Sequence, residues 1–212
     1  KIANCLIPAF VLKTLARLVH KARASSDINQ AKGVSVRLGI HGLELLVGES
    51  ERTRAILHGT IPVLRHSDMY CLRQIAKFEL AEIDDTIENR NKIFESILND
   101  SIKETCLEYM QIPQETLDAI KQEFAGKSFQ VSQVMVWQNG QVSYSNQLLG
   151  FANLAKLVEQ KISQITQEQS RLEQATKNHN LITQNTQDEL RSAVLEIILD
   201  GLCHTTPKIV DK

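Results

Sequence analysis

Apolar residues recur three and four positions apart over most of the 212-residue chain, which is the spacing of helices that bury one face. A first helix should begin near Pro8, because the first helical position tolerates a residue without an N–H group, and should end at the polar Ser25. Three glycines weaken a second helix, expected over residues 40–57. Further helices are predicted over residues 67–75, 84–111 and 114–124.

Residues 128–144 follow a different pattern, in which apolar and polar residues alternate before and after Asn139-Gly140. Alternation is typical of a half-buried strand, and Asn-Gly favours a two-residue turn between strands. These residues therefore predict one small β-hairpin in an otherwise helical chain.

The last third of the chain carries a heptad seam, in which successive core positions are four and three residues apart. The seam runs from Phe151 to Leu172, with a polar residue at Gln169. A second apolar helix over residues 187–202 is its expected partner, and the polar segment 176–186 is the expected tip. We therefore expect an antiparallel helical hairpin that projects as a contact arm and contributes little to the folding of the lobe before it.

These elements together predict a mainly α-helical fold. The expected organisation is a helical region over residues 1–75, a helical linker region with the small β-hairpin over 76–146, the helical hairpin over 147–204 and a tail over 205–212. The sequence begins at Lys1, without a charged leader before an apolar segment, and we expect it to be a piece of a longer protein.

Composition narrows the classes of function. The 24 Lys and Arg nearly cancel the 25 Asp and Glu, which disfavours a generally basic nucleic-acid-binding protein. The longest apolar run, residues 5–12, is far shorter than the ~20 residues of a membrane-spanning helix. Four widely spaced cysteines without a Cys-x-x-Cys pair are typical of reduced thiols. We expect a cytoplasmic protein with no membrane partner and no nucleic-acid partner.

The near-zero net charge conceals a strong segregation along the chain. Residues 1–66 carry 10 basic and 4 acidic side chains, whereas residues 67–128 carry 7 and 13. Lys13, Arg17 and Lys21 lie at i, i+4 and i+8 of the first predicted helix, where like charges weaken an isolated helix. A separate partner of opposite charge could compensate this basic stripe. We favour the simpler interpretation that the stripe is solvated or packed beside the acidic part of the chain.

No motif in the sequence forms a self-contained active site. Gly126-Lys127-Ser128 has the form of the end of a phosphate-binding loop, but Lys121 stands where that loop needs a glycine, and a helix precedes it where a strand should. The six histidines show no metal-ligand spacing, and His66 with Asp68 would supply only two ligands. We therefore expect an ordinary loop at 126–128, no catalytic residue and no metal site.

The segment DINQAKGVSVRLGI, residues 27–40, resembles the lid region of the magnesium-chelatase-like and MoxR-type AAA+ ATPases, which form rings. Three later segments run in the same order as in that family, namely IPVLRHSDM from Ile61, AKFEL from Ala76 and VLEIILDGL from Val194. The resemblance implies that residues 1–75 form an AAA+-type helical lid. It also implies that a nucleotide-binding core lies upstream of this sequence.

By this resemblance Arg37 is the sensor-2-like arginine that contacts the γ-phosphate of ATP, with Gly33 and Ser35 in the same motif. A guanidinium suits this task because its fixed fork binds phosphate oxygens bidentately and keeps its proton. ATP and Mg²⁺ would bind only through the missing core, because the sequence has no recognisable phosphate loop or metal carboxylate. Without the resemblance, a structural ion pair between Arg37 and an acidic residue is the simpler interpretation.

Two functions from different classes follow from this reading. The first is a C-terminal part of an AAA+ remodelling ATPase, whose partners are the core polypeptide, neighbouring ring subunits and a protein substrate or adaptor bound by the helical hairpin. The second is a non-enzymatic helical protein-interaction module. A third idea, a DNA-reading turn at residues 27–37, is disfavoured by the net charge. A phosphate-loop motif encoded immediately upstream would decide for the ATPase.

We predict that the isolated chain hydrolyses no ATP, because nothing in its sequence holds Mg²⁺ or positions the attacking water. Phosphate release from the purified protein is the measurement. Turnover that Lys127→Ala abolishes would show instead that residues 126–128 bind phosphate.

Overall fold

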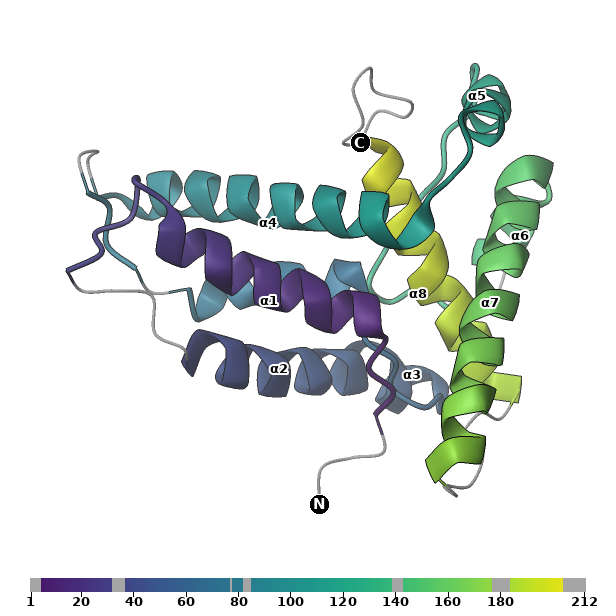
Figure 1. Ribbon diagram of the computed structural model, residues 1–212, viewed down its shortest axis with the longest axis horizontal. Coiled ribbons are helices and arrows are strands. Elements are labelled where there is room, and N and C mark those ends of the chain that lie inside the picture. Colours follow the sequence, from purple (N-terminus) through teal and green to yellow (C-terminus); the bar gives the residue numbers. More distant parts are fainter. Residues whose placement is uncertain are drawn as a thin grey trace.

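The computed structural model describes residues 5–31, 37–76, 78–81, 85–138, 143–176 and 184–203, with the backbone alone for residues 37, 168–176 and 184–185. Helices dominate this part of the chain, as the apolar spacing predicts (Figure 1). A π-helical segment, η1, joins α2 to α3, and η2 is a 3-10 helix. The elements are α1 (Ala9–Ala24), α2 (Arg37–Ser50), η1 (Glu51–Ala55), α3 (Ile56–His58), η2 (His66–Gln74), α4 (Ile87–Met110), α5 (Gln114–Glu123), α6 (Tyr144–Leu148), α7 (Ala152–Thr176) and α8 (Gln184–Cys203).

The residue bounds of the observed helices agree closely with the predicted bounds. The second helix begins at Arg37, three residues earlier than expected, and its helical path continues through η1 to His58. The fourth begins only at Ile87, because the side chain of Thr86 accepts the N–H of Asn89 (3.2 Å) and caps it there. The predicted helices are thus confirmed, and side-chain capping explains the shifted start of α4.

The helices α1, α2 and α4 lie side by side, with α1 between the other two (Figure 1). η2 packs against both α2 and α4. Gly42 makes one of these contacts possible, because a Cβ atom there would lie 3.2 Å from Leu72 of η2 and 3.4 Å from Leu15 of α1. A glycine that weakens an isolated helix therefore lets α2 approach two neighbours closely.

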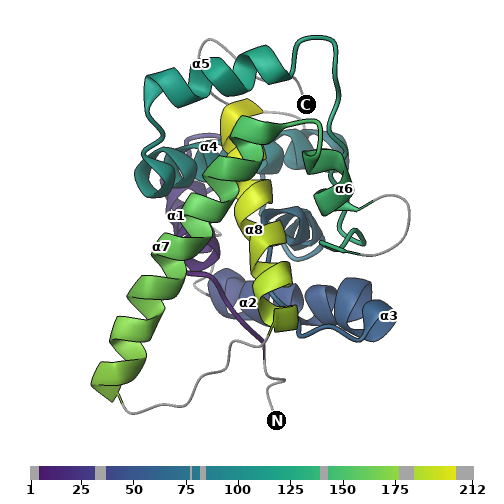
Figure 2. The same cartoon turned by 90° about the vertical axis from the view of Figure 1, so that its right-hand side faces the viewer.

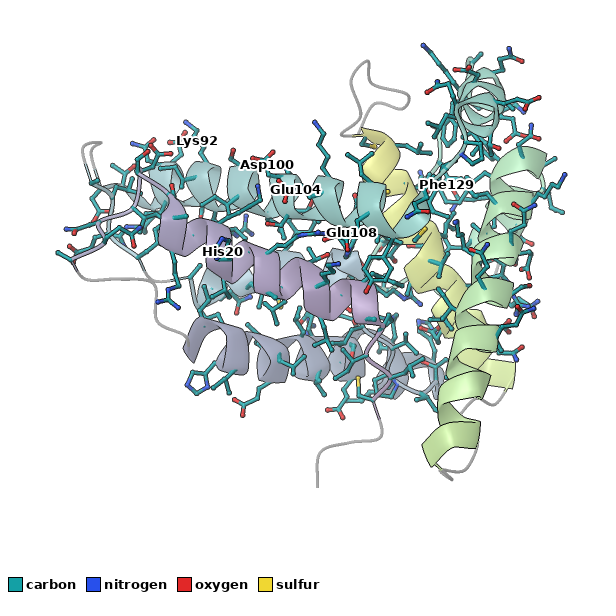
Figure 3. The ribbon with its side chains drawn as sticks, in the orientation of Figure 1. His20, Lys92, Asp100, Glu104, Glu108 and Phe129 are labelled. Atoms are coloured by element: carbon teal, nitrogen blue, oxygen red, sulfur yellow. The ribbon has the colours of Figure 1, made fainter. Side chains whose placement is uncertain are left out.

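The basic stripe of α1 packs against acidic residues of α4. Lys13 and Arg17 both pair with Glu108, and the Nζ of Lys21 lies 2.8 Å from Glu104. Figure 3 shows Glu104 and Glu108 on the part of α4 that runs beside α1. The favoured interpretation of the stripe is confirmed, since the opposite charge comes from the acidic part of this same chain.

Helix α8 occupies the centre of the molecule, and this corrects the expectation of a projecting arm. It packs against α4, α7 and η2, and every residue from 192 to 199 is buried (Figure 2). A helix that is covered on all sides belongs to the core. The antiparallel α7–α8 hairpin exists as predicted, but one of its two helices holds the rest of the molecule together (Figure 2).

The heptad seam of α7 is confirmed where side chains are described. Phe151, Val158 and Ile162 are buried, and Ala155 and Ile165 are half-buried. The described residues do not include the side chains of Gln169 and Leu172. They also exclude most of the predicted tip at 176–186 and the tail at 205–212. The domain boundaries stay predictions. No helix in the described part of the chain is both long enough and apolar enough to cross a membrane.

The predicted β-hairpin is wrong for the residues that the structure describes. Residues 128–138 form turns, bends and extended chain without strand pairing, and Asn139-Gly140 lies outside the described residues. The side chain of Ser143 accepts the N–H of Asn146 (3.3 Å) and caps α6, which begins at the last residue of the predicted hairpin. The N–H groups of Tyr144 and Ser145 donate to the carbonyl oxygens of Val136 (3.3 Å) and Trp137 (3.0 Å), so the two sides of the predicted hairpin meet without forming a strand ladder in the described residues.

Two glycine substitutions test this packing. Gly201→Ala should lower the free energy of unfolding by about 1–3 kcal/mol or more, because the added Cβ would overlap the Sγ of Cys106 on α4. Gly48→Ala is the matched control in an exposed helical position, where nothing lies within 4 Å, and should raise stability by about 1 kcal/mol. Urea unfolding of both variants is the measurement. Equal effects would contradict the close approach of α8 to α4.

Candidate functional site

Of the three residues that the sequence suggests for nucleotide contact, the structure describes the backbone of Arg37. Arg37 is the first residue of α2, and its backbone is described without its side chain. Gly33 and Ser35 fall in residues 32–36, outside the described residues. The described part of the chain therefore places the backbone of Arg37 at a helix N-terminus, where anions are favoured. The contact between Arg37 and ATP stays a prediction.

The loop that precedes this motif is anchored at both of its ends. The amide of Gln30 donates hydrogen bonds to the carbonyl oxygens of Ala22 (3.3 Å) and Ser25 (3.0 Å), which satisfies acceptors at the end of α1. The buried Ile28 forms an antiparallel bridge with Leu80. These contacts hold residues 28 and 30 against the end of α1 and against Leu80.

A network of buried charges connects η1, η2 and α8. Arg54 of η1 forms a bidentate pair with Asp68 of η2, with N–O distances of 2.8 and 2.7 Å, and both side chains are fully buried. The same guanidinium donates to the carbonyl oxygens of Val63 (2.8 Å) and Gln133 (2.9 Å). One arginine therefore joins η1, η2 and the 128–138 segment.

A second arginine, Arg65, joins this network to α8. Its guanidinium contacts Glu189, lies 3.3 Å from Glu196, and donates to the carbonyl oxygen of Met135 (2.7 Å). The hydroxyl of Tyr144 donates to Glu196 at 2.9 Å. Burial lowers the pKa of Arg65, but Glu189 and Glu196 more than offset this, so its pKa is raised and the guanidinium keeps its charge.

Sequence reasoning missed this network, although a signal for it was present. Glu189 and Glu196 lie seven residues apart and therefore on one face of the predicted helix, and Glu196 lies within the apolar run from Val194 to Leu199. Acidic residues on an apolar face need partners in a folded protein. Arg54 and Arg65 are the basic counterparts, and apolar residues also lie close to them in the sequence.

The carboxylates of this network stabilise the fold and are not accessible to a substrate. Asp68, Glu189 and Glu196 are at most 1% exposed and each lies against a guanidinium, so none of them can reach a substrate as a general base. No group of three or more His, Cys, Asp or Glu side chains among the described residues could hold a metal ion. We interpret these charges as a specific internal connection between elements.

The cysteines and the phosphate-loop-like segment also lack reactive geometry. Burial raises the pKa of the Cys71 and Cys106 thiols to about 12, which suppresses the nucleophilic thiolate. Gly126 and Lys127 follow helix α5, and the ammonium of Lys127 donates to the carbonyl oxygen of Gly150 (2.9 Å). The segment 126–128 is therefore a loop, as the sequence predicts.

Comparison with known proteins adds no family or relative to this picture. Neither the protein-family models, nor the curated proteins, nor the solved structures give a match to the chain.

Tyr144 offers a test of the buried network. Tyr144→Phe should lower the free energy of unfolding by about 1.5–3 kcal/mol, because Glu196 loses a hydrogen bond to a charged acceptor. Burial and then Glu196 raise the pKa of Tyr144, so the folded state keeps a proton that the unfolded state releases. This contribution is complete below about pH 10 and is lost as the pH rises further.

As the pH rises above about 10, the free energy of unfolding of Tyr144→Phe should therefore fall less than that of the parent protein. Tyr109→Phe is the matched control, since this ring is 40% exposed, and it should change stability by less than about 0.5 kcal/mol. Chemical unfolding across a pH series measures both effects. Identical alkaline behaviour of parent and Tyr144→Phe would contradict the role given to this hydroxyl.

Proposed function

We propose that this chain is the lid-containing, C-terminal part of a magnesium-chelatase-like, MoxR-type AAA+ ATPase. In this role Arg37 contacts the γ-phosphate of ATP, and the core polypeptide supplies the phosphate loop and the Mg²⁺ site. Neighbouring subunits of a ring are its partners, and its location is cytoplasmic. The observation that carries the proposal is that the segments resembling this family contact one another in the folded chain.

The four segments meet in two pairs. In the first pair, the N–H of Asn29 donates to the carbonyl oxygen of Glu79 (2.8 Å), and Ile28 forms an antiparallel bridge with Leu80. In the second pair, Glu196 lies 3.3 Å from Arg65 and accepts the N–H of Ser67 at 3.1 Å. Chance similarities scattered along a sequence have no reason to fall on contacting segments. The pairing therefore supports a common origin of all four.

The start of α2 suits the task given to Arg37. Unsatisfied N–H groups and the helix dipole favour negative charge at a helix N-terminus, and a guanidinium there adds a bidentate donor for phosphate oxygens. The described residues contain no metal-ligand cluster, so in this proposal Mg²⁺ is held by the core. The chain's own contribution is then to sense and stabilise the charge on the transferred phosphoryl group.

A second candidate is a non-enzymatic interaction module, and the surface next to α2 favours it. Ile56 and Leu57 of α3 are 76% and 62% exposed, and Ile40 of α2 is 59% exposed. Exposed apolar residues can serve a protein contact without any nucleotide, and Ile56 and Leu57 are adjacent in the chain. Either function uses this side of the molecule, and nucleotide dependence separates them.

Replacement of Arg37 tests the ATPase proposal in a complex reconstituted with its core polypeptide. Arg37→Ala removes a charge-assisted contact of about 1.5–3 kcal/mol, and most of the loss should appear in turnover because charge moves during phosphoryl transfer. Arg37→Lys should fail nearly as badly, since a point charge cannot reproduce the guanidinium fork. ATP turnover and thermal stability of the complex are the two measurements.

Arg52→Ala is the matched control on the same continuous helical path. Among the described residues Arg52 forms an ion pair with Glu49 alone, at 2.7 Å and near the surface, so turnover should hold. A structural ion pair at Arg37 predicts the opposite result, namely lost stability with or without nucleotide. Unchanged turnover per folded Arg37→Ala complex would overturn the sensor assignment.

A further inference from the structure

A cavity of about 580 Å³ opens where the start of α1, the end of α4 and the middle of α7 meet. Its apolar lining includes Phe10 of α1, Met110 of α4, Ile165 of α7 and Leu190 of α8. This volume lies within the range of roughly 300–1,000 Å³ that is typical of small-molecule pockets. Residues of four helices thus line a partly open, mainly apolar cavity.

One cation in the cavity wall has no counter-charge. Lys161 of α7 is half-buried, and it makes no hydrogen bond or ion pair with any described residue. Burial lowers the pKa of Lys161, in keeping with a cation that has lost water without gaining a carboxylate. The other charges of the lining, Lys13 and Glu108, pair with each other. An anionic group in the cavity would complete the charge balance.

The size and polarity of the site define the ligand. A single ammonium balances a group with one negative charge, which favours a carboxylate over a phosphate. Gln164 lies one helical turn from Lys161 and also lines the cavity, so its amide can donate a second hydrogen bond. The remaining wall is mainly apolar and suits a hydrocarbon chain.

We propose that this cavity binds a medium-chain aliphatic carboxylate, with its chain against Phe10, Met110, Ile165 and Leu190 and its carboxylate on Lys161. The site is separate from the start of α2 and needs no nucleotide. It therefore goes beyond the function proposed above, and it stands or falls independently of that function.

Calorimetric titration of the purified chain with decanoate, at about pH 7 where the carboxylic acid is ionised, tests the proposal. We expect saturable binding of one molecule per chain. Decanol, which keeps the chain without the charge, should bind about tenfold more weakly, and acetate should not bind. Decanoate that fails to saturate, or that binds no better than decanol, would overturn the proposal.

Variants of α7 locate the site. Lys161→Met keeps the apolar stem and removes the charge, so decanoate should bind about tenfold more weakly while decanol is unaffected. Lys161→Arg should retain binding. Lys156→Met, at an exposed position of the same helix, is the matched control and should bind decanoate like the parent.

Thermal melting shows that each variant is folded before it is titrated. Filling the cavity with Ile165→Trp should abolish the binding of both decanoate and decanol. Undiminished binding by Lys161→Met, or by a folded Ile165→Trp, would place the ligand elsewhere and refute the proposed site.

Discussion

The contact of Arg65 with Glu189 and Glu196 is the interaction on which the rest of the structure depends. Hydrophobic packing is not directional, and an apolar helix such as α8 could slide or rotate against its neighbours. Ion pairs in a dry interior have strict geometry, because each charge costs several kcal/mol to desolvate and needs all of its partners. The two glutamates therefore fix the register of α8 against the chain around Arg65. Arg54 extends this constraint to η1 through Asp68.

These buried contacts connect α2 to α7 through η1 and α8. α2 continues through η1, where Arg54 reaches Asp68 and comes within 3.6 Å of Glu189 on α8. α8 in turn packs along α7. In the proposed ATPase, a shift at Arg37 would therefore be carried through buried, directional contacts to α7.

The sequence predicts those features that depend on local periodicity or on charge alone. The helices follow from apolar spacing, and the neighbour of Lys13, Arg17 and Lys21 follows from the acidic surplus of residues 67–128. The central place of α8 could not be read this way, because a heptad partner for α7 explains its apolar residues equally well. The described part of 128–144 lacks a strand ladder, although the N–H groups of Tyr144 and Ser145 donate to the carbonyl oxygens of Val136 and Trp137, and alternation alone does not distinguish such a contact from a hairpin.

In the candidate site, too, some features could be predicted from the sequence and others could not. Arg37, the first described residue of α2, lies three residues before the start that apolar spacing predicts. The partners of Arg54 and Arg65 come from residues up to 131 positions away, and no spacing rule links them. Only the presence of acidic residues on an apolar helix signals that such partners must exist.

Two sets of ion pairs in this chain show why charge count says little about architecture. The pairs between α1 and α4 lie at the surface, where solvent screens them and each is worth at most about 1 kcal/mol. The pairs around Arg65 are similar in chemistry but buried, so losing one partner leaves an uncompensated charge in the core. The surface pairs can therefore change with little consequence for the fold. The buried pairs specify how α8 meets η1, η2 and the segment that precedes α6, and they set the arrangement on which any function at α2 or in the α7 cavity is built.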